Sequence, residues 1–114
     1  MNNGIQIVVY PVADLAQAKA QFGKLLGVEP YVDSPYYVGY KLGNMEIGLD
    51  PNGHKHGRKG TIAWYDVSDI QAEFQALLDA GAQPEEKPHD VGGGLLVASV
   101  IDPSGNRIGV RQES

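Results

Sequence analysis

The sequence contains no cysteine, a single tryptophan and no long hydrophobic run. The missing thiols exclude disulfides, thiolate zinc sites and cysteine nucleophiles. No apolar run approaches the length of about 18 residues that a membrane-spanning helix needs. The N-terminus also lacks the basic and apolar stretches of a signal peptide. We therefore expect a cytoplasmic protein without a membrane partner.

Positive charge is scarce as well. Nine Lys and Arg against 14 Asp and Glu give a net charge of −5 and a pI near 5.0. This balance repels the phosphates of nucleic acids, so we expect no nucleic-acid partner. A chain of 114 residues suffices for one domain with one core. Its 15 glycines indicate many short elements joined by tight turns.

Two segments resemble each other and predict a duplicated unit. Both Ile7–Leu15 and Ile62–Ile70 consist of an apolar strand followed by a Val-x-Asp step into a helix. Asp14 is placed to cap the first helix, and Ser68 or Asp69 to cap the second. Each helix then has an apolar stripe and ends near a glycine that is followed three residues later by proline. The stripes are Leu15, Ala18, Phe22, Leu25 and Leu26, then Ile70, Phe74, Leu77 and Leu78, and the glycines are Gly27 and Gly81.

Three strand-like segments follow each helix, and tight turns between them favour antiparallel pairing. The segments lie near 28–33, 36–42 and 45–50, and again near 83–90, 94–101 and 106–112. We predict one domain over 1–114, with repeat one at about 4–50, a linker at about 51–59 and repeat two at about 60–112.

These residues resemble the vicinal oxygen chelate superfamily, which includes glyoxalase I, extradiol dioxygenases, fosfomycin-resistance enzymes and bleomycin-resistance proteins. The resemblance implies an α+β fold of two β-α-β-β-β repeats, whose curved mixed sheets form a cup with the helices on the outer face. It extends from about Ile5 to Gln112. It rests on Val12-Ala13-Asp14-Leu15, Phe22, Leu25-Leu26-Gly27, Val67-Ser68-Asp69-Ile70, Leu78-Asp79-Ala80-Gly81-Ala82 and Asp102-Pro103-Ser104-Gly105-Asn106.

Catalytic members of this superfamily hold a divalent metal with His, Gln or Glu side chains on the first and last strand of each repeat. Carried onto this sequence, the four ligand positions fall on Ile7, Gly48, Ile62 and Gly109. None of these residues can coordinate a metal. We therefore expect no cofactor, and a divalent metal is the alternative if Glu46, on the same face as Gly48, takes part.

Side chains alternate between the two faces of a strand, so residues two positions from these four point to the same face. They are further candidates for a small-molecule site. An aromatic ring beside a cation suits an organic ligand, although a core role for Trp64 and a surface role for Arg111 stay open. The candidate ligand-binding residues are Ile7, Val9, Gly48, Ile62, Trp64, Gly109 and Arg111.

Other polar and aromatic residues give weaker signals. Glu46 and His89 are the weak catalytic candidates. His54 and His56 fit a solvated basic loop better than a metal site. By parity Tyr36 and Tyr40 share a face with each other, and Gly92-Gly93-Gly94 forms either a lid or a permissive turn.

The sequence favours a small-molecule-binding protein, for a drug or a metabolite, that lacks the usual metal ligands and forms a homodimer. The alternative is a glyoxalase- or dioxygenase-like enzyme, a lyase or a dioxygenase, acting on a small metabolite. An interaction module with a vestigial site is a third reading. Whether the protein is an enzyme stays open at this point, because fold does not establish function.

Overall fold

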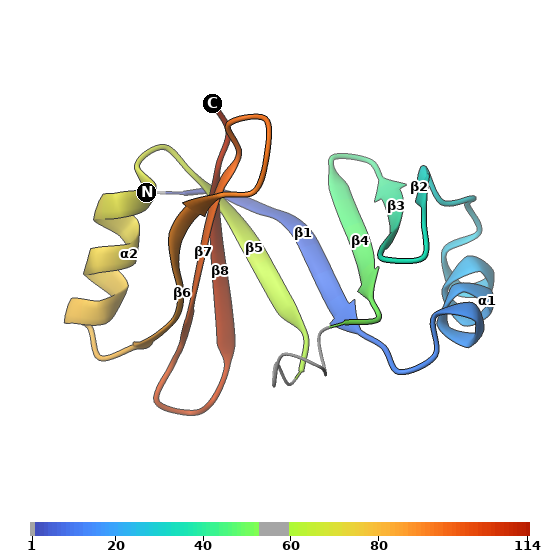
Figure 1. Cartoon of the computed structure of the whole chain (residues 1–114), viewed down its shortest axis with the longest axis horizontal. Coiled ribbons are helices and arrows are strands. Elements are labelled where there is room, and N and C mark those ends of the chain that lie inside the picture. Colours follow the sequence, from blue (N-terminus) through green and yellow to red (C-terminus); the bar gives the residue numbers. More distant parts are fainter. Residues whose placement is uncertain (1, 53–59) are drawn as a thin grey trace. The chain divides into compact units, whose positions relative to one another are not determined.

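The computed structural model describes residues 2–52 and 60–114 (Figure 1). His54, His56 and most of the predicted linker lie outside the described residues. Within the described part, neither helix has the length and hydrophobicity to cross a membrane. The elements are β1 (Asn2–Pro11), α1 (Leu15–Leu26), β2 (Val32–Asp33), β3 (Val38–Leu42), β4 (Met45–Asp50), β5 (Ile62–Val67), α2 (Ile70–Asp79), β6 (Gln83–Asp90), β7 (Leu96–Ile101) and β8 (Arg107–Gln112).

The chain divides into two compact units, one of Ile7–Thr61 and one of Met1–Gln6 with Ile62–Ser114. In the first unit the strand order is β2-β3-β4-β1, and β1 runs parallel to β4. In the second unit the order is β5-β8-β7-β6, and β5 runs parallel to β8. The remaining pairs within each unit are antiparallel. The prediction of an α+β fold with two β-α-β-β-β repeats and mixed sheets is therefore confirmed.

Helix α1 begins and ends at the residues that the sequence indicates. The Asp14 carboxylate accepts a hydrogen bond from the Gln17 N–H at 3.0 Å, which satisfies a backbone donor that the first turn leaves free. Gly27 adopts the left-handed conformation, with φ of 69°, and its N–H donates to the Gly23 carbonyl. The buried core beneath α1 contains Ala18, Val38, Tyr40 and Leu49, with Tyr10, Val12, Leu15, Phe22, Leu26 and Ile47 packed around them.

The prediction that Leu25 belongs to the buried apolar stripe of α1 is wrong. Leu25 is 75% exposed. Phe22 and Leu26 already fill the core side of the last helical turn, so Leu25 falls at the uncovered edge of the stripe.

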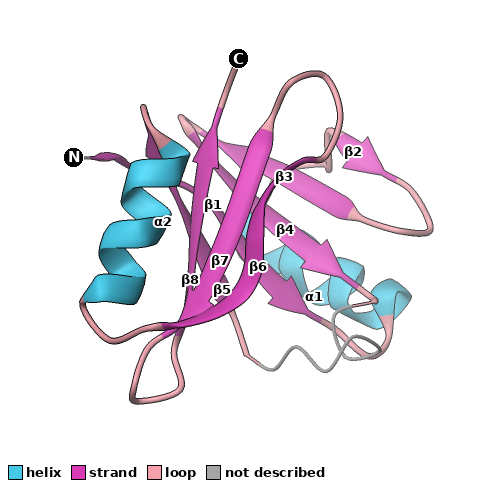
Figure 2. Cartoon of the chain, turned by 60° about the vertical axis from the view of Figure 1, so that its left-hand side comes forward, coloured by secondary structure: helices cyan, strands magenta, loops and turns pink. Residues whose placement is uncertain are grey.

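Helix α2 packs on one face of β6, β7 and β8 (Figure 2). Of the two predicted caps, Asp69 is the one used, and it accepts from the Ala72 N–H at 3.1 Å. The helix ends at Asp79 and its C-cap is Ala80, one residue before the predicted Gly81, which has φ of 110°. The core beneath α2 contains Val67, Ile70, Phe74, Ala98, Val100 and Val110, with Tyr65, Leu77, Leu78, Ala82, Leu96 and Ile108 around them.

Two predictions between α1 and β3 need correction. The strand expected near 28–33 is only Val32–Asp33, since Pro30 has no N–H to donate to a ladder. Tyr36 and Tyr40 do not share a face, because Tyr36 precedes β3 in a bend where strand alternation does not apply. Tyr36 is 73% exposed, whereas Tyr40 is fully buried against α1.

Candidate functional site

The face of the first sheet that α1 does not cover carries four of the residues singled out from the sequence. Strand partners point to the same face of a sheet. The register pairs Ile7 with Glu46 and Val9 with Gly48. Their neighbours along β4 and β1 pack instead in the core under α1. Ile7, Val9, Glu46 and Gly48 therefore lie together on what we call the open face of the first unit.

Two tyrosines converge on the buried carboxylate of this open face. Glu46 is 6% exposed, and its two carboxylate oxygens accept hydrogen bonds from the hydroxyls of Tyr31 and Tyr37. Burial, followed by the hydrogen bond to Glu46, raises the pKa of Tyr37 well above its ordinary range. The Glu46 carboxylate is thus engaged within the chain, and it holds the segment between α1 and β3 against β4.

This arrangement brings Tyr37 over one of the four metal-ligand positions. A β-carbon at Gly48 would overlap the hydroxyl and ring of Tyr37. The space beside this glycine therefore belongs to an aromatic side chain from the loop before β3.

The open face of the second unit repeats this relationship. Trp64 pairs with Gly109, and Asp66 pairs with Arg111. A β-carbon at Gly109 would come within 2.5 Å of the Trp64 ring. Ile62 lies two residues before Trp64 on the same strand and is 2% exposed. Alternation along each strand, together with the register between β5 and β8, therefore places Ile62, Trp64, Gly109 and Arg111 on one face.

Arg111 borders a cavity of about 300 Å³, together with Gly93, Leu95, Glu113 and Ser114. Its guanidinium donates to Glu113 at 3.1 Å and lies 3.8 Å from Asp66. The Arg111 side chain is only 13% exposed, so it is not the simple surface residue that the sequence left possible. Gly93 belongs to the predicted glycine-rich tip, where Gly92, Gly93 and Gly94 all have positive φ.

A second arginine on this face escaped the sequence analysis. Arg107 forms a two-pronged ion pair with Glu85, with N–O distances between 3.0 and 3.1 Å. The Ser99 hydroxyl donates to the same carboxylate at 2.9 Å. The two charged side chains are 8% and 14% exposed. The alternating strand pattern put Arg107 on the face of Gly109, but nothing in the sequence pointed to Glu85 as its partner.

The family's metal does not fit the residues present. Two isoleucines and two glycines stand at the four ligand positions, and aromatic rings cover both glycines. Glu46, the alternative donor, already accepts two phenol hydrogen bonds. His89 has a half-exposed side chain whose Nδ1 lies 2.7 Å from the Lys87 carbonyl. Over residues 2–52 and 60–114, no three His, Asp or Glu side chains form a group that could hold a metal ion.

Comparison with known proteins identifies the family. The model of the Glyoxalase/Bleomycin resistance protein/Dioxygenase superfamily matches residues 4–110. The chain therefore belongs to this superfamily. No curated protein matches it in sequence.

Solved structures show the same fold at low sequence identity. A superfamily member from Vibrio splendidus 12B01 has a TM-score of 0.74 at 16% identity, covering 96% of this chain and 100% of that one. The Mn(II)-bound glyoxalase from Novosphingobium aromaticivorans has a TM-score of 0.75 at 16% identity, covering 98% and 39%. A protein described as NAD-dependent benzaldehyde dehydrogenase from Legionella pneumophila has a TM-score of 0.73 at 16% identity, covering 95% and 98%. Such different descriptions on one fold carry no activity over to this chain.

Proposed function

We propose that this protein is a small-molecule-binding member of the superfamily, and that its ligand is a drug or a metabolite. Aromatic side chains occupy the space in which other members of the superfamily hold a metal. The observation that carries the proposal is the cover over the two glycines. Tyr37 lies over Gly48, and Trp64 lies over Gly109. A residue able to coordinate a metal at either position would have to displace a ring that packs against the strand.

The proposed site in the second unit combines Trp64 and Arg111, which share its open face, with the cavity that Arg111 borders. Trp64 offers a partly exposed aromatic surface. Arg111 supplies a cation on the same face and borders the cavity of about 300 Å³. That volume is at the lower end of the range for ligand pockets, about 300 to 1,000 Å³. An organic molecule with a flat group and an acceptor for the guanidinium matches this chemistry. Ile62 and Gly109 complete the proposed site.

In the first unit, Ile7, Val9 and Gly48 remain ligand-binding candidates on the open face of that unit. Glu46 and His89 are weaker candidates for acid–base chemistry in the alternative of a glyoxalase- or dioxygenase-like enzyme. Both Glu46 oxygens accept hydrogen bonds from tyrosines, and His89 lies exposed. We therefore propose ligand binding, rather than catalysis, as the function.

The proposal includes a homodimer and a cytoplasmic location. Closed two-fold dimers are the commonest assemblies of small soluble proteins.

One native mass spectrum tests metal, assembly and ligand together. The purified full chain is measured alone and again with excess nickel or zinc. We expect a dimer that takes up no stoichiometric metal, and a retained additional mass would report the ligand class. One tightly held metal per chain would overturn the metal-free assignment, and a monomeric mass would overturn the dimer alone.

Trp64 gives an optical test of the site, since it is the only tryptophan. Titration with the aromatic sulfonate dye anilinonaphthalene sulfonate should quench the Trp64 emission saturably. Arg111→Gln should weaken this binding, whereas Lys87→Gln, at an exposed residue of β6, should not. An unchanged affinity in Arg111→Gln would remove Arg111 from the proposed site.

A further inference from the structure

The open face of the first unit has a second glycine directly beside Gly48. The register pairs Gly39 of β3 with Gly48 of β4, so the two strands leave a flat floor of bare backbone at this point. A β-carbon at Gly39 would come to 3.1 Å from the rings of both Tyr31 and Tyr37. Neither glycine has a positive φ. The space that the rings occupy, rather than the backbone conformation, therefore accounts for glycine at both positions.

Glu46 gives this floor a hydrogen-bond acceptor. It lies on the same face of β4 as Gly48 and is buried. One carboxylate oxygen accepts from the Tyr37 hydroxyl and the other from the Tyr31 hydroxyl. A flat floor that ends at a buried carboxylate is complementary to a phenol, whose ring is planar and whose hydroxyl donates. The chain itself supplies such a phenol with the side chain of Tyr37.

Tyr37 comes from a short loop that is closed on itself. The Ser34 N–H donates to the Tyr37 carbonyl at 3.1 Å, and the Ser34 hydroxyl accepts from the N–H groups of Tyr36 and Tyr37 at 3.2 and 3.1 Å. Pro35 and Tyr36 are exposed, and Tyr37 is only partly buried. Because these hydrogen bonds lie within the loop, they can persist when the loop moves away from the sheet as a unit.

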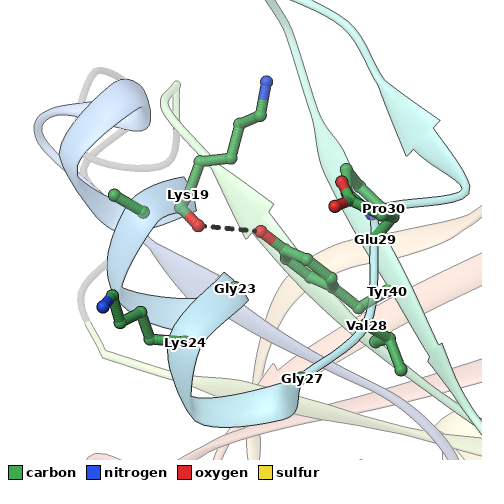
Figure 3. A pocket seen from close by; sticks show the side chains of 9 residues that line it. Lys19, Gly23, Lys24, Gly27, Val28, Glu29, Pro30 and Tyr40 are labelled. Carbon is green, nitrogen blue, oxygen red and sulfur yellow. Dashed lines mark hydrogen bonds between the residues drawn. The ribbon is translucent and has the colours of Figure 1, made fainter.

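The buried core of the first unit lies on the opposite face of the sheet. Tyr40, one residue after Gly39, belongs to that core. It borders a cavity of about 450 Å³ beside α1, and its hydroxyl donates to the Lys19 carbonyl at 3.1 Å (Figure 3). Withdrawal of the Tyr37 ring would therefore uncover the glycine floor and Glu46 without opening the core beneath α1.

We propose that Tyr37 is a removable plug in a phenol-binding site, and that a para-substituted phenol takes its place on the glycine floor with its hydroxyl donating to Glu46. The inference rests on the function proposed above, since it names a ligand class for the first unit. A ligand binds only to chains in which the plug has moved out, so the plug lowers the observed affinity by the fraction of open chains. A molecule without the hydroxyl cannot replace the hydrogen bond that Tyr37 gives up.

The test is an NMR titration of the isotope-labelled full chain with p-cresol, which reproduces the tyrosine side chain. In the unaltered protein we expect weak, saturable shifts of the Gly39 and Gly48 amides. Tyr37→Gly lacks the plug and should bind p-cresol about tenfold more tightly or better. Tyr36→Gly changes an exposed residue of the same loop and should bind like the unaltered protein. An equal gain in both variants would overturn the role of Tyr37.

The unaltered protein decides whether the plug is removable, even if Tyr37→Gly folds poorly. Absence of shifts at Gly39 and Gly48 would show that Tyr37 is a fixed part of the fold and would overturn the inference. Quenching of Trp64 emission without those shifts would place p-cresol in the second unit. That result would also overturn the inference, but it would leave the proposed function standing.

Toluene tests the ligand class, because it has the ring of p-cresol without the hydroxyl. It should bind Tyr37→Gly about tenfold more weakly than p-cresol does, since one Glu46 oxygen is then left without its donor. Equal binding of toluene and p-cresol would overturn the assignment of a phenol.

Discussion

The ring of Trp64 lies against the backbone of Gly109, so that a β-carbon at position 109 would approach ring carbon Cε3 to 2.5 Å. The two residues are direct partners across the parallel strands β5 and β8. Tyr37 has the corresponding relationship to Gly48 in the other repeat, although it comes from a loop rather than from a strand. In both repeats an aromatic side chain occupies the space that a metal-binding side chain would need.

Placing an acidic side chain at position 109 should therefore destabilise the fold. We expect Gly109→Glu to lower the free energy of unfolding by about 1–3 kcal/mol, as overpacked cores do. Urea denaturation measures the loss. In a Trp64→Ala background the same substitution should be less damaging, because the ring is gone. Strictly additive losses in the double variant would contradict the contact between ring and glycine.

The Glu46 carboxylate should be a strong anchor for the segment before β3. Its replacement in Glu46→Gln removes a charged acceptor from two phenol donors. Hydrogen bonds to charged groups contribute about 1.5–3 kcal/mol each, so we expect a loss of about 2 kcal/mol in unfolding free energy. Glu29→Gln, at an exposed glutamate of the same unit, provides the control and should change little. Equal stabilities of the two variants would show that the tyrosines do not depend on the carboxylate.

Ionisation of Tyr37 should lower the stability of the fold at alkaline pH. Its pKa is raised above the ordinary value of 10.0, first by burial and then by Glu46. A phenol that ionises later in the folded chain than in the unfolded chain stabilises the fold fully below pH 10.0. This contribution is lost as the pH rises from there toward the folded-state pKa.

The ultraviolet absorbance of tyrosinate can follow this titration. Two of the six tyrosines, Tyr37 and Tyr40, have a raised pKa in the folded protein, so the late absorbance change should be smaller in Tyr37→Phe. In Glu46→Gln the part that belongs to Tyr37 should move to lower pH, since a negative neighbour has been removed. If Tyr37→Phe retains the full late change, Tyr37 does not contribute to it.

Local signals account for what the sequence predicted correctly. The caps at Asp14 and Asp69 each depend on residues three apart. Strand parity also placed Trp64 on the face of Ile62, and Arg111 on the face of Gly109, because alternation is a property of the backbone.

Contacts between residues far apart in the sequence could not be predicted from local signals. Parity says which face Trp64 occupies, but the rotamer that brings its ring onto Gly109 depends on packing. Tyr37 reaches Glu46 from a loop, where alternation gives no direction. For the same reason parity failed at Tyr36.

The ion pair between Arg107 and Glu85 joins residues 22 positions apart, and it should behave as a buried pair. Removing one partner leaves an uncompensated charge, which typically costs about 3–5 kcal/mol. We therefore expect Arg107→Leu to be strongly destabilised. The double variant Arg107→Leu with Glu85→Leu should recover much of the loss, because it removes both charges together.

Lys19→Gln is the control, because it breaks the exposed pair with Asp33 and should change stability by at most about 1 kcal/mol. Denaturant melts of the four proteins measure these differences, and a double variant no more stable than Arg107→Leu would mean that the pair does more than neutralise buried charge.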